Sequence, residues 1–138
     1  MWKAICRSVR GTAHISNGKP NQDSIRCKID SAGEYGILAV ADGHGSDKCF
    51  RSDLGSKIAV DTAIELLEKI VRQSKGTNHS FIKDLIENKL PDSLASLWKK
   101  RVEEDYLAMG FSKLKKGENP QYFDANSIKT EMALEEIH

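Results

Sequence analysis

The chain has 138 residues, of which 39% are hydrophobic and 30% charged, as is usual for one soluble globular domain. Its formal net charge of +1 gives no overall attraction to polyanions, so we expect no nucleic-acid partner. No membrane-length apolar run or signal-peptide apolar region is present, so we expect a cytoplasmic protein with no membrane partner. The cysteines Cys6, Cys27 and Cys49 form no CxxC pair and are odd in number, which argues against a disulfide framework.

The first third of the chain is predicted to form three strands separated by turns. Residues 4–9 alternate in polarity, and residues 24–29 place apolar side chains on one face and basic side chains on the other. Residues 36–41 form a short apolar run, which is typical of a strand covered on both faces. Turn-forming residues occur at 14–21 and 31–34.

The spacing of apolar residues then changes to three and four, which predicts an amphipathic helix from about residue 52 to residue 73. The polar residues 74–80 end it, and a second helix carries apolar residues between 81 and 86. A third helix follows Pro91, with Ser93 as its N-cap. Strands followed by helices indicate an α+β fold rather than alternating βαβ units.

Two aspartates are placed for metal binding. Asp23 precedes one predicted strand and Asp42 ends another, so antiparallel pairing would bring both carboxylates to one edge of the sheet. Carboxylates and carbonyl oxygens are the ligands that Mg²⁺ and Mn²⁺ prefer, and Gly43 permits its carbonyl to turn inward. Taken singly, each aspartate is more commonly a turn or cap residue.

Three motifs occur in order: Gly-Thr-Ala-His at residues 11–14, Gly-Lys-Pro-Asn-Gln-Asp-Ser at 18–24, and Val-Ala-Asp-Gly-His-Gly-Ser at 40–46. Together they resemble the N-terminal portion of the type 2C protein phosphatases, most closely a bacterial branch with a Gln-Asp pair in the first motif. Residues 51–60 are similar to the helix that follows in that branch. The resemblance implies part of an α/β/β/α sandwich over residues 1–106, and it leaves residues 107–138 as a polar tail of unassigned structure.

The resemblance also implies a metal-dependent protein serine/threonine phosphatase with a two-metal centre of Mn²⁺ or Mg²⁺. In such enzymes a metal-bound water attacks the phosphorus of a phosphorylated protein substrate. Asp42 resembles the carboxylate that bridges the metals, Gly43 a carbonyl ligand, and Asp23 the acidic residue of the first motif. His44 occupies the position of the proposed acid that protonates the leaving oxygen, although a loop histidine without a partner is the alternative.

The sequence departs from the family pattern near the first motif. Gln22 replaces a common glutamate, which removes one charge near the metal. The usual phosphate-binding arginine is missing: Gly18 stands nearest its position, and Lys19 and His14 are the candidate substitutes.

The later acidic motifs of the family do not occur in these 138 residues, and Asp124-Ala125-Asn126 is no substitute for them. The chain is therefore a truncated product, or another chain completes the fold, or the tail covers the gap; the sequence favours none of these. A half sandwich would expose an apolar sheet face. The alternative function is a catalytically inactive remnant that acts as a binding or regulatory module.

Overall fold

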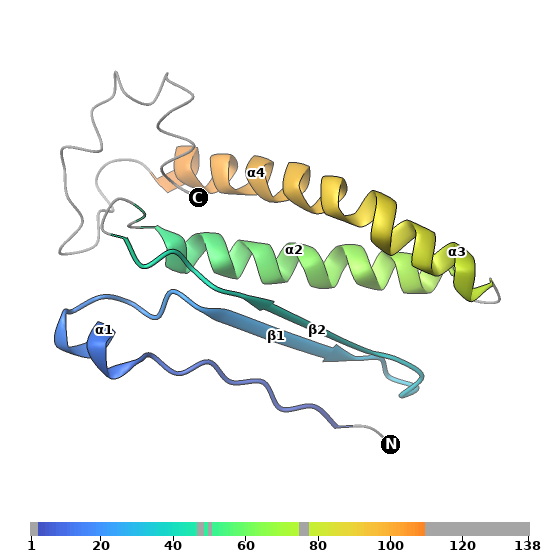
Figure 1. Cartoon of the computed structure of the whole chain (residues 1–138), viewed down its shortest axis with the longest axis horizontal. Helices are drawn as coiled ribbons and strands as arrows, with labels where there is room; N and C mark the ends of the chain where they lie inside the picture. The colour runs from blue at the N-terminus through green and yellow to red at the C-terminus, as the bar shows by residue number, and fades with distance from the viewer. Residues whose placement is uncertain (1–2, 47–48, 50, 75–77, 110–138) are drawn as a thin grey trace.

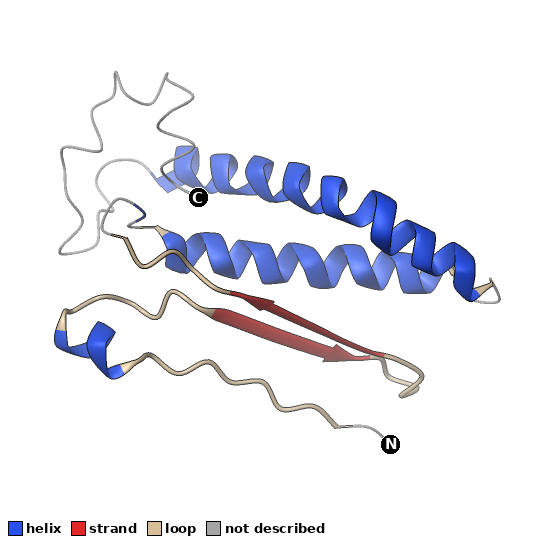
Figure 2. Ribbon diagram, viewed as in Figure 1, coloured by secondary structure: helices blue, strands red, loops and turns tan. Residues whose placement is uncertain are grey.

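The computed structural model describes residues 3–46, 49, 51–74 and 78–109. Its elements, in chain order, are α1 (Thr12–Ser16), β1 (Ser24–Ile29), β2 (Gly36–Ala41), α2 (Ser52–Gln73), α3 (His79–Asp84), the π-helical turn η2 (Leu85–Lys89) and α4 (Leu90–Met109). Figure 2 shows one hairpin of strands beside a pair of long helices. The α+β class predicted from the sequence is confirmed. The predicted tail falls outside the described residues from residue 110 onward.

The two strands β1 and β2 have the predicted bounds and pair antiparallel, with Ser24 opposite Ala41 and Ile29 opposite Gly36. The carboxylate of Asp30 holds the connecting turn by accepting hydrogen bonds from the main-chain N–H groups of Ala32, at 3.1 Å, and Tyr35, at 3.0 Å. Such local bonds from an aspartate side chain are what make a tight turn stable.

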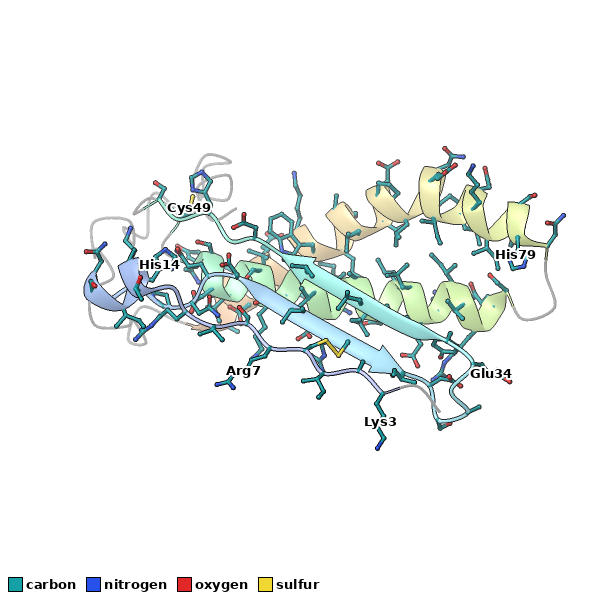
Figure 3. All side chains as sticks on the ribbon, turned by 60° about the horizontal axis from the view of Figure 1, so that its bottom comes forward. Lys3, Arg7, His14, Glu34, Cys49 and His79 are labelled. Atoms are coloured by element: carbon teal, nitrogen blue, oxygen red, sulfur yellow. A yellow bond between two sulfur atoms is a disulfide. The ribbon has the colours of Figure 1, made fainter. Side chains whose placement is uncertain are left out.

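The segment before α1 corrects two predictions. Residues 4–9 form no strand; this segment runs alongside β1 without joining the sheet (Figure 1). A disulfide between Cys6 and Cys27 ties it to β1, visible as a yellow bond in Figure 3, so the prediction of no disulfide was wrong. Counting cysteines failed because the pairing depends on which segments lie side by side. The predicted turn at residues 14–21 begins inside helix α1.

Helix α2 covers one face of the sheet, and α4 packs antiparallel on the other side of α2 (Figure 1). The core lies between the sheet and α2. Its buried members come from β2 and from the middle of α2: Ile37, Ala39, Val60 and Ile64. Burial of these side chains is the main force that holds the hairpin on the helix.

The same face of the sheet also carries the basic residues of β1. The register sets Arg26 opposite Ala39 and Lys28 opposite Ile37, and directly opposed residues share a face. Arg26 forms an ion pair with Asp61 of α2, and Lys28 forms one with Glu68 at 2.6 Å. The basic side of β1 therefore faces the helix.

The opposite face of the sheet is apolar and open among the described residues. Leu38 is 62% exposed and Val40 is 68% exposed. The alternating apolar residues Ile25, Cys27 and Ile29 of β1 share this face. The prediction that residues 36–41 are covered on both faces is therefore wrong for the described part of the chain. The exposed apolar face is instead the one expected of a half sandwich.

Among the helices that follow the hairpin, the differences from prediction begin after residue 78. Helix α2 has the predicted bounds, but α4 begins at Leu90, so Ser93 lies inside the helix and is not its cap. Pro91 lacks the N–H that a regular helix would use there, and the π-helical turn η2 changes the hydrogen-bond pattern just before it. The indole N–H of Trp98 donates to the carbonyl of Gly55 at 2.9 Å and joins α4 to α2. Within the described residues, no helix has the length and apolarity needed to cross a bilayer.

The ion pairs on α2 predict a pH dependence of stability. Hydrogen bonds from Lys28 at 2.6 Å and then Arg72 at 2.5 Å lower the pKa of Glu68 below its ordinary value of 4.5. A carboxylate whose pKa is depressed by folding contributes stability above its unfolded-state pKa, and this contribution is lost as the pH falls through the folded-state pKa. We therefore expect the free energy of unfolding, measured by denaturant titration, to fall as the pH drops below about 4.5. Glu68→Gln should flatten this fall, whereas Glu103→Gln, an exposed residue of α4, should leave it unchanged. Equal slopes for wild type and Glu68→Gln would contradict this account.

Candidate functional site

Asp23 and Asp42 leave the sheet at the same edge. Ser24 pairs with Ala41 at the last rung of the ladder, so the residue before β1 and the residue after β2 are brought together. The main-chain N–H of Gly43 donates to Oδ1 of Asp23 at 3.2 Å, which links the two segments directly. Both aspartates are exposed and thus accessible to a ligand. The antiparallel pairing expected from the sequence is confirmed.

Gly43 is required here because the two segments approach each other closely. A Cβ at this position would lie 2.1 Å from the carbonyl oxygen of Gln22 and 2.8 Å from its carbonyl carbon. Both are main-chain atoms, which cannot rotate away as a side chain can. Since Gly43 does not have a positive φ, the requirement is for space and not for an unusual backbone conformation. The sequence had suggested a different reason for this glycine, the freedom to turn its carbonyl inward.

A buried hydrogen-bond network lies behind the two aspartates. The Gln22 side chain is buried, and its Nε2 donates to Oγ of Ser52 at 2.9 Å. Oγ of Ser52 lies 2.6 Å from the carbonyl oxygens of both His44 and Cys49. The single hydroxyl proton must go to one of these carbonyls, so Ser52 accepts from the amide group of Gln22. This fixes the orientation of the amide, and its Oε1 is left buried without a hydrogen-bond partner among the residues that the structure describes.

Sequence reasoning placed Ser52 only at the start of the predicted helix and missed its contacts. A signal was available, because Ser52 and Ser56 are four residues apart and lie on the buried face of α2. Oγ of Ser56 lies 2.9 Å from Oγ of Ser24 at the start of β1. Polar residues at a helical spacing on a buried face need partners, and here both find them beside the candidate site.

Lys19 lies against the loop that follows β2. Its Nζ donates to the carbonyl of Gly45 at 3.0 Å, and its own carbonyl accepts from Arg10 at 3.2 Å. Of the two candidate substitutes for the phosphate-binding arginine, Lys19 is thus brought to the Asp42 loop. His14 lies on α1 (Figure 3), and the described contacts do not connect its imidazole to that loop.

The imidazole of His44 is exposed, and its Nδ1 accepts a hydrogen bond from the main-chain N–H of Ser46 at 3.2 Å. A neutral His44 in this arrangement carries its proton on Nε2. The alternative of a loop histidine without any partner therefore does not hold. Nε2–H is the atom that remains available as a donor.

The start of α2 is anchored to the end of α4. The Arg51 side chain is only 2% exposed, forms an ion pair with Asp105, and lies 5.2 Å from the ring centroid of Tyr106. Burial raises the pKa of Tyr106, and the neighbouring Arg51 charge partly opposes that shift. This anchor holds Ser52, the next residue, in place relative to the second helix.

The residues at the sheet edge fit a hydrated divalent cation only in part. Across the described ranges, no group of three or more histidine, cysteine, aspartate or glutamate side chains is arranged to hold a metal. The oxygen donors nearby are the exposed carboxylates of Asp23 and Asp42 and the orphaned Oε1 of Gln22. Oxygen donors suit Mg²⁺ or Mn²⁺, which retain several waters.

One comparison with known proteins identifies a family. The family model described as protein phosphatase 2C matches residues 10–129, which is most of the chain and includes every candidate residue above. Neither the characterised proteins nor the solved structures give a significant match. Because the match covers most of the chain, the chain belongs to the protein phosphatase 2C family.

Proposed function

We propose that this chain carries the metal-binding edge of a protein serine/threonine phosphatase. The observation that carries the proposal is the meeting of Asp23 and Asp42 at one sheet edge, joined by the hydrogen bond from Gly43 to Asp23. Family membership supports the reaction class, because type 2C enzymes hydrolyse phosphate esters. The substrate would be a phosphoserine or phosphothreonine side chain in a protein.

Each candidate residue has a role in this proposal. Asp42, Asp23 and the carbonyl of Gly43 hold Mn²⁺ or Mg²⁺. The cation, when bound, activates water as the nucleophile and offsets charge on the phosphoryl group. His44 would act as the acid in its imidazolium form, which gives the Nε2 proton to the leaving oxygen and becomes neutral; protonation of Nδ1 requires that its hydrogen bond from Ser46 first be broken. The ammonium group of Lys19, held at the loop by Gly45, attracts the phosphate.

We also propose that the apolar sheet face is covered in the working protein, as in an α/β/β/α sandwich. The exposed Leu38 and Val40 support this, because a monomeric protein gains stability by burying such a face. A second polypeptide, or a further segment of the same polypeptide, would cover this sheet face and supply the remaining acidic ligands.

A second candidate function is a binding module without catalysis. The incomplete ligand set favours it, because the described residues contribute two clustered carboxylates and no third acidic side chain. Such a module would bind a phosphorylated peptide through Lys19 without turnover.

The deciding experiment is Mn²⁺ binding by calorimetry, with p-nitrophenyl phosphate turnover measured in the same sample. Asp42→Asn should lower turnover by more than about 100-fold, beyond the range found for residues that only support metal ligands. Asp92→Asn on α4 is the matched control and should have no effect. Metal binding without turnover would favour the binding module. Absence of both would exclude catalysis by this chain alone.

A further inference from the structure

One side chain joins three segments behind the candidate site, and it is not among the residues that face a substrate. Oγ of Ser52 contacts Gln22, which precedes Asp23, at 2.9 Å. It also contacts the carbonyl of His44, in the loop after Asp42, at 2.6 Å. Ser52 itself is the first residue of α2 and is 3% exposed. Gln22 and His44 are 30 and 8 residues from Ser52 in the sequence, so the three residues come together only in the folded chain.

We propose that Ser52 is the positioning residue of the metal site: its hydroxyl sets the relative placement of Asp23 and Asp42. The expected effect on metal binding rests on the proposed function, whereas the effect on the geometry of the two aspartates does not. Ser52 touches neither aspartate, so it would act through Gln22 and through the loop that contains His44.

The physical reason is the state of the Gln22 amide. Its Oε1 is buried and has no hydrogen-bond partner in the described part of the chain, and its Nε2 donates to Ser52. Removing the hydroxyl would leave both ends of a buried amide unsatisfied, and a buried donor without an acceptor is costly. The side chain would then have to move toward water.

That movement would reach both aspartates. The carbonyl of Gln22 fills the space beside Gly43, which an added Cβ would enter at 2.1 Å. Asp23 follows Gln22 directly and accepts the hydrogen bond from Gly43. A shift of Gln22 therefore displaces Asp23 and weakens its contact with the residue after Asp42. The other end of the network acts in the same direction, because a loop carbonyl, that of His44 or that of Cys49, loses its donor.

The test compares two buried serines at opposite ends of α2. Ser74, the C-cap residue that follows α2, is 4% exposed, and its hydroxyl donates to the main-chain carbonyl of Ile70 at 2.6 Å. Ser52→Ala and Ser74→Ala therefore remove the same group from opposite ends of α2. Two quantities are measured for each: hydrogen exchange of the Gly43 amide by NMR, and Mn²⁺ affinity by calorimetry.

We expect Ser52→Ala to accelerate exchange at Gly43 and to weaken Mn²⁺ binding by about tenfold, within the range for residues that orient metal ligands. Ser74→Ala should change neither. A double-mutant cycle gives a further readout: Gln22→Ala combined with Ser52→Ala should cost less affinity than the sum of the two single losses, because part of the effect of Ser52 passes through Gln22.

The outcomes separate the two proposals. If the wild-type chain binds no Mn²⁺ while Ser52→Ala still accelerates exchange at Gly43, the metal-binding function is wrong and the positioning role of Ser52 stands. If Gly43 exchanges at the wild-type rate in Ser52→Ala, the positioning role is overturned. Additive losses in the double-mutant cycle would also overturn it, since they would show that Ser52 does not act through Gln22.

Discussion

Gly43→Ala is expected to lower the free energy of unfolding by about 3 kcal/mol, at the upper end of overpacking costs. The new Cβ would lie 2.1 Å from the carbonyl oxygen of Gln22, so the lead-in to β1 and the exit from β2 would have to separate. Separation also breaks the hydrogen bond from Gly43 to Asp23, and Mn²⁺ affinity should fall with stability. Denaturant titration and calorimetry measure the two effects.

Gly45→Ala is the matched control, two residues further along the same loop. A Cβ there would meet its nearest atom, Oε1 of Gln22, at 3.8 Å, which is an ordinary contact. Its effect on stability should therefore stay within about 0.5 kcal/mol, as for a typical surface substitution. Equal stability of Gly43→Ala and Gly45→Ala would show that the two segments are not in contact as described.

Asp105→Ala is expected to destabilise the protein by a similar amount, about 3 kcal/mol, because it leaves a buried charge without a partner. The Arg51 side chain is 2% exposed, and across the described ranges its Nε and Nη1 have no hydrogen-bond partners. Asp105 is 42% exposed, so the loss comes mainly from the stranded arginine and not from the solvated carboxylate. Thermal or denaturant unfolding measures the change.

Two further variants show whether the loss of stability comes from leaving the buried Arg51 charge unpaired or from the loss of an ion pair as such. Glu104→Ala breaks the exposed pair with Lys100 on the same helix, at 3.8 Å, and should cost no more than about 0.5 kcal/mol. The double variant Arg51→Met with Asp105→Ala removes the buried charge as well, so it should recover most of the stability. A double variant as unstable as Asp105→Ala alone would refute this explanation.

The sequence alone determined the elements whose pattern is local. Strands 24–29 and 36–41 and the helix 52–73 have the predicted bounds, because the period of apolar residues in each is a property of that segment. The same alternation at residues 4–9 produced no strand, since a strand also needs a partner with which to form hydrogen bonds. Local pattern was likewise insufficient at Ser93, where the helix begins before the expected cap.

Which face of the sheet is covered was decided by tertiary structure. The alternation of residues 24–29 predicted one apolar and one basic face, and in the structure it is the basic face, with Arg26 and Lys28, that meets α2, where Asp61 and Glu68 pair with it. An alternating strand has two faces, and its period does not say which of them meets the helix.

The candidate site divides in the same way. Asp23, Asp42, Gly43 and His44 could be identified from ordered motifs, because short motifs are continuous in sequence. The buried contacts of Ser52, the close approach of Gly43 to Gln22 and the Cys6–Cys27 disulfide could not. Each joins residues about twenty to thirty positions apart. The bond from Gln22 to Ser52 needs α2 packed on the hairpin, the approach of Gly43 to Gln22 needs the hairpin itself, and the disulfide needs the N-terminal segment beside β1.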